Sequence, residues 1–262
     1  MKREIRLFMY NMFHSRFMFV IFFLMCLLTG FLSPLWISQL RGVSMTASGL
    51  LAIDSSISYS FTFMLMCLLV AYLCASDMKD KVINYEVMSG HSRAGIYFSR
   101  TILTVVFATL FSLILSFVPV IVGIIIYGWG DNMEFGYAML RLLFCAFPYM
   151  RMAAFICFLA FLVKKATGVM VWGYMVYVFG AFTEGLGTKI PYMTAFKNAV
   201  ALLDFKARSV YNISMEGGIV DYSVYRSKPE AGLLLTTAVV SLLMTVIYLL
   251  MGYGLFRHDD LN

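Results

Sequence analysis

The chain has 262 residues, of which 61% are hydrophobic and 13% charged, and its formal net charge at pH 7 is +6. A soluble domain carries about 25% charged residues, so this composition excludes an ordinary water-soluble protein and predicts an integral membrane protein. In such a protein the positive charge is explained by cytoplasmic flanks of membrane spans, so it does not predict binding to nucleic acid. The five cysteines lie in apolar segments without close pairing, and we interpret them as buried hydrophobic residues rather than disulfides or metal ligands.

The chain begins with a basic, amphipathic stretch over residues 1–16. Apolar residues such as Phe8 and Met12 recur there at helical spacing, while Lys2 and Arg6 lie among them. This pattern predicts an amphipathic helix on the cytoplasmic surface of the membrane. The alternative is the charged start of a signal peptide, but several spans follow and no Ala-x-Ala cleavage site is visible.

Six apolar segments of membrane-spanning length follow. We predict transmembrane helices at about residues 17–37, 57–75, 101–127, 136–163, 166–183 and 231–256. Residues 40–56 are predicted to lie outside, and Pro119 is expected to kink the third span. The longest polar segment, residues 184–230, also falls outside on this topology. Within it, residues 192–205 have an apolar repeat that predicts a short helix.

The distribution of basic residues sets the orientation. More than half of the 20 Lys and Arg residues fall on one side of the predicted spans, and the positive-inside rule makes that side cytoplasmic. Both termini then lie in the cytoplasm. The whole chain, residues 1–262, is interpreted as a single transmembrane domain.

The most informative polar segment, residues 77–100, joins the second and third predicted spans on the cytoplasmic side. Residues 80–88 contain neither Gly nor Pro and predict a short helix. Gly90 is placed to end that helix, and Ser92 is placed to cap a second helix that starts near Arg93 and enters the membrane. The sequence therefore predicts a helical elbow on the cytoplasmic face.

The elbow carries a resemblance to a known family. The residues concerned are Ser89-Gly90-His91-Ser92-Arg93 and, shortly after them, Ile96-Tyr97-Phe98-Ser99-Arg100. Followed by a long apolar span, they resemble the loop between the second and third spans of ABC transporter permeases of the type-2 exporter class. The resemblance is closest to small bacterial permeases that export, or give immunity to, antimicrobial peptides and peptide toxins. The Gly-Thr pair usual earlier in this loop is absent, although Asp77, Asp80 and Glu86 supply its acidic character.

The resemblance implies an all-α integral membrane fold in the bacterial cell membrane. It has six spans, an interfacial helix at the N-terminus, and short outer helices between the fifth and sixth spans. Its implied partners are two copies of an ABC ATPase subunit and a second permease chain, identical or related. ATP and Mg would be held by the ATPase, so no cofactor is expected on this chain.

The elbow is the segment that the resemblance implies as the contact with the ATPase. The coupling residues implied are Glu86, Ser89, Gly90, His91, Ser92 and Arg93. Arg93 is the candidate for a charge-assisted contact with an acidic ATPase residue. The alternative is that Arg93 is an ordinary cytoplasmic flank that binds lipid headgroups.

Two arginines, Arg141 and Arg151, fall within the fourth predicted span. An arginine at membrane depth costs on the order of 3 kcal/mol or more unless it meets water or a partner. One interpretation is that Arg151 lines a transport path or pairs across a subunit interface. The other is that it snorkels outward or binds carbonyl groups freed near Pro148.

The chain lacks several kinds of chemistry. It contains no GxxxxGK[ST] phosphate loop, and His14, His91 and His258 are solitary, so neither ATP hydrolysis nor a metal site is predicted. The predicted spans hold no Asp or Glu, which argues against an ion-coupled transporter and against an intramembrane hydrolase.

These observations predict a non-enzymatic permease subunit that exports a hydrophobic cargo. Met-rich spans suit an amphipathic peptide, although Met and Phe are equally ordinary lipid-facing residues. The alternative function is a non-transporting membrane sensor, or an immunity protein that sequesters a peptide at the membrane.

Overall fold

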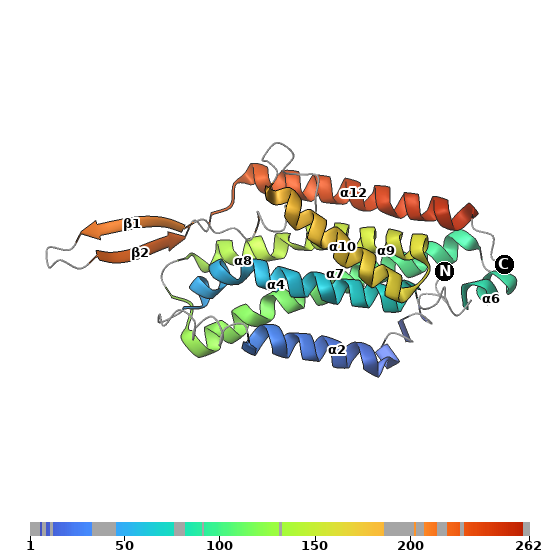
Figure 1. Ribbon diagram of the computed structural model, residues 1–262, viewed down its shortest axis with the longest axis horizontal. Coiled ribbons are helices and arrows are strands. Elements are labelled where there is room, and N and C mark those ends of the chain that lie inside the picture. Colours follow the sequence, from blue (N-terminus) through green and yellow to red (C-terminus); the bar gives the residue numbers. More distant parts are fainter. Residues whose placement is uncertain are drawn as a thin grey trace.

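The computed structural model describes residues 6, 9–10, 13–32, 46–75, 82–90, 92–130, 133–185, 202, 207–213, 219–225 and 228–258. In chain order the elements are α2 (Arg16–Leu27), η1 (Leu28–Leu32), α4 (Ala47–Val70), η2 (Ala71–Ala75), α6 (Val82–Met88), α7 (Arg93–Tyr127), α8 (Phe135–Phe144), α9 (Ala146–Val163), α10 (Ala166–Gly185), β1 (Ala207–Ile213), β2 (Ile219–Tyr225) and α12 (Ala231–His258). The long helices lie side by side along the molecule, with α6 at one end and the β1–β2 hairpin projecting from the other (Figure 1).

Three helices are long and apolar enough to cross a membrane: Arg93–Tyr127, Phe135–Val163 and Ala231–Arg257. Three shorter apolar helices accompany them, at Arg16–Phe31, Phe61–Ala75 and Ala166–Phe179. The described part of the chain therefore has the character of a multi-pass helical membrane protein. The full six-span topology stays a prediction.

The predicted helical fold is confirmed for the body of the molecule, but the strands β1 and β2 were not predicted. They pair antiparallel, with Ala207 opposite Tyr225 and Ile213 opposite Ile219. Val, Ile and Tyr recur in both strands, which is typical of β structure, and a Gly pair lies between them at residues 217–218. The outer helix expected at residues 192–205 lies outside the described residues except for Leu202, which is helical and buried.

Helix α4 begins earlier than predicted. Residues 40–56 were expected to form an outer loop, yet the helix starts at Ala47 and runs on through η2 to Ala75. The carbonyl groups of Gly128 and Trp129 accept hydrogen bonds from the backbone N–H groups of Ala47 and Ser48, at 2.9 and 3.1 Å. Because these N–H groups have no partner within the helix itself, the loop after α7 fixes the start of α4.

The fourth predicted span consists of two helices, α8 and α9, which are interrupted at Cys145. Pro148 explains the interruption, because it lacks the N–H that would bond to the carbonyl of Phe144 four residues earlier. By contrast, α7 is assigned as one continuous helix through Pro119. Of the N-terminal segment, residues 6, 9–10 and 13–14 are helical, and the rest of the predicted interfacial helix lies outside the described residues.

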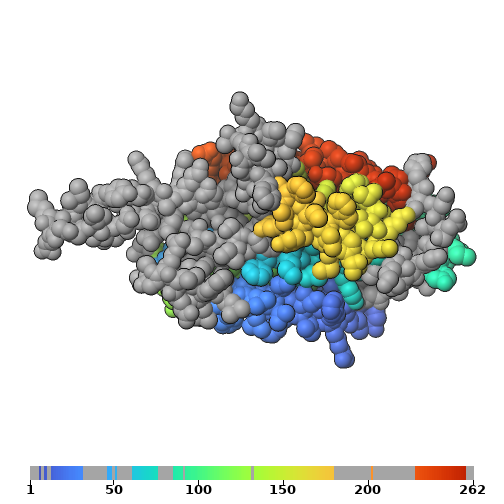
Figure 2. Space-filling model, in the orientation of Figure 1, coloured from blue at the N-terminus to red at the C-terminus, as the bar shows by residue number. Residues whose placement is uncertain are grey.

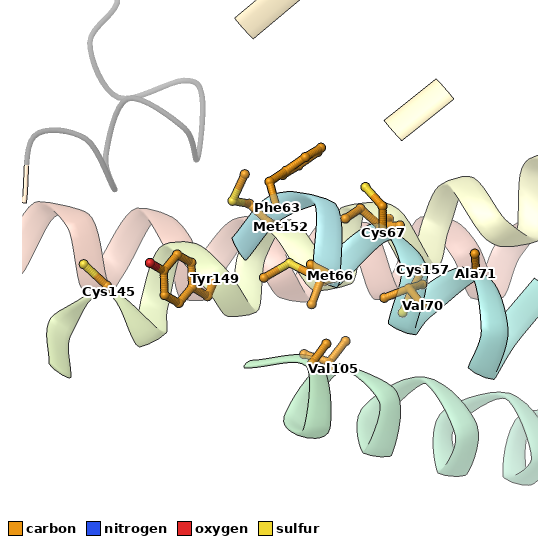
Figure 3. Packing of buried hydrophobic residues seen from close by; sticks show 14 of the residues in the cluster. Phe63, Met66, Cys67, Val70, Ala71, Val105, Cys145, Tyr149, Met152 and Cys157 are labelled. Carbon is orange, nitrogen blue, oxygen red and sulfur yellow. The ribbon is translucent and has the colours of Figure 1, made fainter. Parts of the chain in front are cut away.

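The core is built around α9, which packs against α4, α7 and α12. Ala153, Ala154 and Ala160 on α9 are fully buried, and such small residues let membrane helices approach closely. Met66 and Val70 of α4 and Val105 of α7 lie in the same cluster, shown close up in Figure 3.

The outer faces of the bundle are also apolar. On α10 and α12 the exposed residues include Trp172, Tyr174, Phe179, Leu235 and Leu243. Both helices lie on the face of the molecule drawn in Figure 2. Exposed apolar surface on several neighbouring helices is expected where lipid is the solvent.

Candidate functional site

The predicted end of the first elbow helix is confirmed. The backbone N–H of Ser89 donates to the carbonyl of Tyr85 at 2.9 Å, and the N–H of Gly90 donates to that of Val87 at 3.1 Å. The Ser89 hydroxyl donates to the carbonyl of Glu86 at 2.7 Å. Gly90 has a φ of +92°, a backbone conformation that residues other than glycine rarely adopt. The turn is therefore fixed by local bonds that the sequence itself specifies.

The predicted start of the second helix is confirmed as well. Ser92 has extended backbone angles, and its hydroxyl accepts a hydrogen bond from the N–H of Gly95 at 3.2 Å. This is the geometry of a serine N-cap. Helix α7 follows from Arg93 as a single helix to Tyr127, so the elbow leads directly into a long apolar helix. His91 lies outside the described residues.

An ion pair holds α6 against α7. The carboxylate of Glu86 accepts a hydrogen bond from the guanidinium of Arg100 at 2.6 Å, and the two side chains are 22% and 10% exposed. A charge-assisted bond of this length, partly shielded from water, is stronger than an exposed surface pair. Glu86 was predicted as a coupling residue, and its carboxylate here secures α6. Sequence reasoning missed Arg100 as its partner.

Arg93 lies at the junction of two long helices. Its guanidinium donates to the backbone carbonyl of Arg257 at 3.2 Å, near the end of α12. A cation at a helix C-terminus interacts favourably with the carbonyl groups that end the helix. The side chain predicted to meet an ATPase thus binds the C-terminal end of α12, and α6, the start of α7 and the end of α12 lie together at one end of the molecule (Figure 1).

The outer face of α6 carries two apolar residues that the sequence analysis did not single out. Tyr85 is 71% exposed and Met88 is 82% exposed, three positions apart on a helix. On the inner side, Val87 packs against the cluster that contains Tyr97 and Phe161. The spacing of Tyr85 and Met88 was a usable signal, because residues three apart share one face of a helix.

The two intramembrane arginines lie away from the elbow. Arg141 and Arg151 are both buried, and only 1% of Arg151 is exposed. Both take part in interactions inside the protein. Neither side chain reaches the surface, so snorkelling is not observed for Arg141 or Arg151. A role for Arg151 in a transport path would require a conformation that exposes it.

Among the described residues no group of three or more His, Cys, Asp or Glu side chains is placed to hold a metal ion. No protein-family model matches the chain, and no curated protein matches it. Function is therefore inferred from the apolar helices and the geometry of the elbow.

Proposed function

We propose that this chain is the membrane-spanning permease subunit of an ATP-driven exporter of the ABC class. A separate ATPase subunit supplies the energy and docks on the elbow, residues 77–100. Two permease chains, identical or related, form the complete translocator in a bacterial cell membrane. The cargo is an amphipathic peptide or another hydrophobic molecule.

One observation carries this proposal. Helix α6 turns Tyr85 and Met88 outward, while Val87 and Glu86 fasten its inner side to the start of α7. An exposed aromatic–Met pair on a short helix suits a surface that a partner covers, since aromatic residues and Met are enriched in protein–protein interfaces. Because α6 is attached to α7 in this way, a displacement of α6 by a docked partner would move α7 as well.

The charge around the elbow suits a docking surface. Arg93 and Arg100 both belong to α7, and both engage groups of this chain: the carbonyl of Arg257 and the carboxylate of Glu86. On α6, Tyr85 and Met88 are the most exposed of the large side chains described. We expect apolar contacts to supply most of the docking energy, with Arg93 contributing long-range attraction to an acidic surface of the ATPase.

The experiment is co-purification of the tagged chain, expressed from its native operon, in mild detergent. We expect an ATPase subunit to accompany it and to hydrolyse ATP faster in the complex than alone. Replacing Tyr85 and Met88 together with Ala is expected to weaken docking by at least tenfold, since buried aromatic anchors dominate interfaces.

The matched control replaces two exposed apolar residues of α12, Leu243 and Leu250, with Ala. These lie on the lipid-exposed face, and docking should be unchanged. Purification of the wild-type chain without an ATPase, under conditions that keep other transporters intact, would contradict the proposal. That result would favour the non-transporting sensor or immunity protein.

A further inference from the structure

A tyrosine of α7 contacts α12 close to the elbow. Tyr97 lies five residues into α7, between Arg93 and Arg100, and only 1% of it is exposed. Its hydroxyl donates a hydrogen bond to the backbone carbonyl of Leu249 in α12 at 2.8 Å. The two residues are 152 positions apart in the chain. The start of α7 is thus bound to the backbone of the last helix.

Gly252 of α12 provides the space for this contact. A Cβ atom at position 252 would overlap the Tyr97 hydroxyl, well inside the closest approach that real Cβ atoms make. The ring carbon that carries this hydroxyl, Cζ, would be 3.4 Å from the added Cβ, which is an ordinary van der Waals contact. The hydroxyl of Tyr97 therefore occupies the notch left by the missing side chain of Gly252. At Gly254, on the same helix, an added Cβ would meet no atom within 4 Å.

Rigid neighbours hold the tyrosine in this notch. Its ring packs against Phe161 of α9 and Phe256 of α12, with centroids 4.7 and 5.8 Å away, and against Tyr253 at 5.6 Å. Val87 of α6 packs on the same cluster. Because the ring is enclosed on several sides, it has little room to yield if the notch is filled.

We propose that the contact between Tyr97 and Gly252 is a positioning joint that passes movement of the elbow to α12. This inference rests on the proposed function and names the path by which that function would use the elbow. Val87 and the Glu86–Arg100 pair join α6 to α7, and Tyr97 joins α7 to α12. Arg93, one helical turn before Tyr97, holds the end of the same helix. A displacement of α6 therefore moves α7 and α12 together.

The test uses four variants of the full chain in the reconstituted complex with its ATPase. They are Tyr97→Phe, Gly252→Ala, the two combined, and Gly254→Ala as the control. The quantity measured is the number of peptide molecules exported per ATP hydrolysed. A purely structural defect would lower the yield of complex and both rates together, whereas a broken joint lowers this ratio while ATP hydrolysis continues.

We expect Gly252→Ala to lower the export ratio by roughly fivefold to tenfold, within the range of about twofold to thirtyfold found for residues that couple two sites. Tyr97→Phe loses only the hydroxyl bond, and a smaller fall of about twofold is expected. The combined variant should export as well as Tyr97→Phe, because the added methyl then faces Cζ at 3.4 Å instead of the hydroxyl. Gly254→Ala should match the wild type. The proposal would be overturned if Gly252→Ala left the export ratio unchanged, or if the combined variant exported no better than Gly252→Ala.

A second measurement does not depend on the ATPase. Spin labels at positions 88 and 255, both exposed, report the distance between α6 and α12 in the purified chain. We expect one narrow distance distribution in the wild type, a broad one in Gly252→Ala, and a narrow one again in the combined variant. Equal widths in all variants would refute the joint. If the distances behave as expected but no ATPase binds the wild type, the proposed function fails and the joint stands.

Discussion

At the scale of single residues, the elbow depends on one pair of charges. Arg100 is largely buried, and the Glu86 carboxylate is the anion placed 2.6 Å from it. Removing one member of such a pair leaves the other in a poorly solvated position, which costs more than the pair itself contributes. The pair is therefore best tested by removing its members singly and together.

We expect Glu86→Gln to weaken the attachment of α6 by about 1–2 kcal/mol, because the buried guanidinium loses its anion. Arg100→Met should have a similar effect, and the two changes together should cost less than their sum. Amide hydrogen exchange of residues 82–88 measures the local stability of α6 directly. Costs that simply add would mean that the two side chains do not act as a pair.

At the scale of elements, the turn between α6 and α7 depends on a positive φ at Gly90. An added Cβ there would meet no neighbouring atom, so a substitution acts through the backbone alone. We expect Gly90→Ala to destabilise the turn by about 1–2 kcal/mol, the usual cost of left-handed backbone for an L-residue. Faster amide exchange in α6 and weaker stimulation of the ATPase would follow.

The control for this change is Gly136→Ala in α8, where an added Cβ also meets no atom within 4 Å and φ is not positive. Alanine favours a helix over glycine, so this variant should be as stable as the wild type or slightly more stable. Equal exchange rates in α6 for Gly90→Ala and the wild type would show that the turn tolerates a side chain.

The elements also show which features can be predicted from sequence. The end of α6 at Gly90 and the cap at Ser92 were predicted because their hydrogen bonds join residues within four positions of each other. The bond from Arg93 to Arg257 and the start of α4 beside Gly128 depend on residues far apart in the chain. No local sequence pattern predicts such contacts, because they depend on how distant segments pack together.

The hairpin was missed for a different reason. Its strands lie within a long segment that is polar overall, and only residues 220–224 show the strict apolar–polar alternation typical of a strand. The burial of Arg141 and Arg151 could not be predicted either. Both fall within the fourth predicted span, but the side of the helix that faces the core depends on how α8 and α9 pack against their neighbours.

At the scale of the whole molecule, the predicted orientation can be measured. The hairpin and the elbow lie at opposite ends of the bundle (Figure 1). The described cysteines are buried or half-buried, so a new surface thiol will label above a low background. We expect Lys228→Cys, an exposed position between β2 and α12, to react with a membrane-impermeant maleimide in intact cells. Ser89→Cys should react only after the membrane is opened.

The reverse pattern would place the elbow outside the cell and exclude contact with a cytoplasmic ATPase. Labelling of both positions in intact cells would contradict the spanning topology itself. Ser89 is exposed in the structure, so its failure to react in intact cells would reflect the membrane barrier rather than burial.

The length of α7 has a mechanical consequence. Its 35 residues make a rod of about 50 Å, whereas the hydrocarbon core of a bilayer is about 30 Å thick. The helix must therefore tilt strongly or extend well beyond the core, and in the proposed orientation the elbow is attached to its cytoplasmic end. A rod of that length acts as a lever: a rotation of about 10° about one end moves the other by about 9 Å. In the proposed permease, a small rotation at α6 would thus become a displacement close to the width of a helix at the far end of α7.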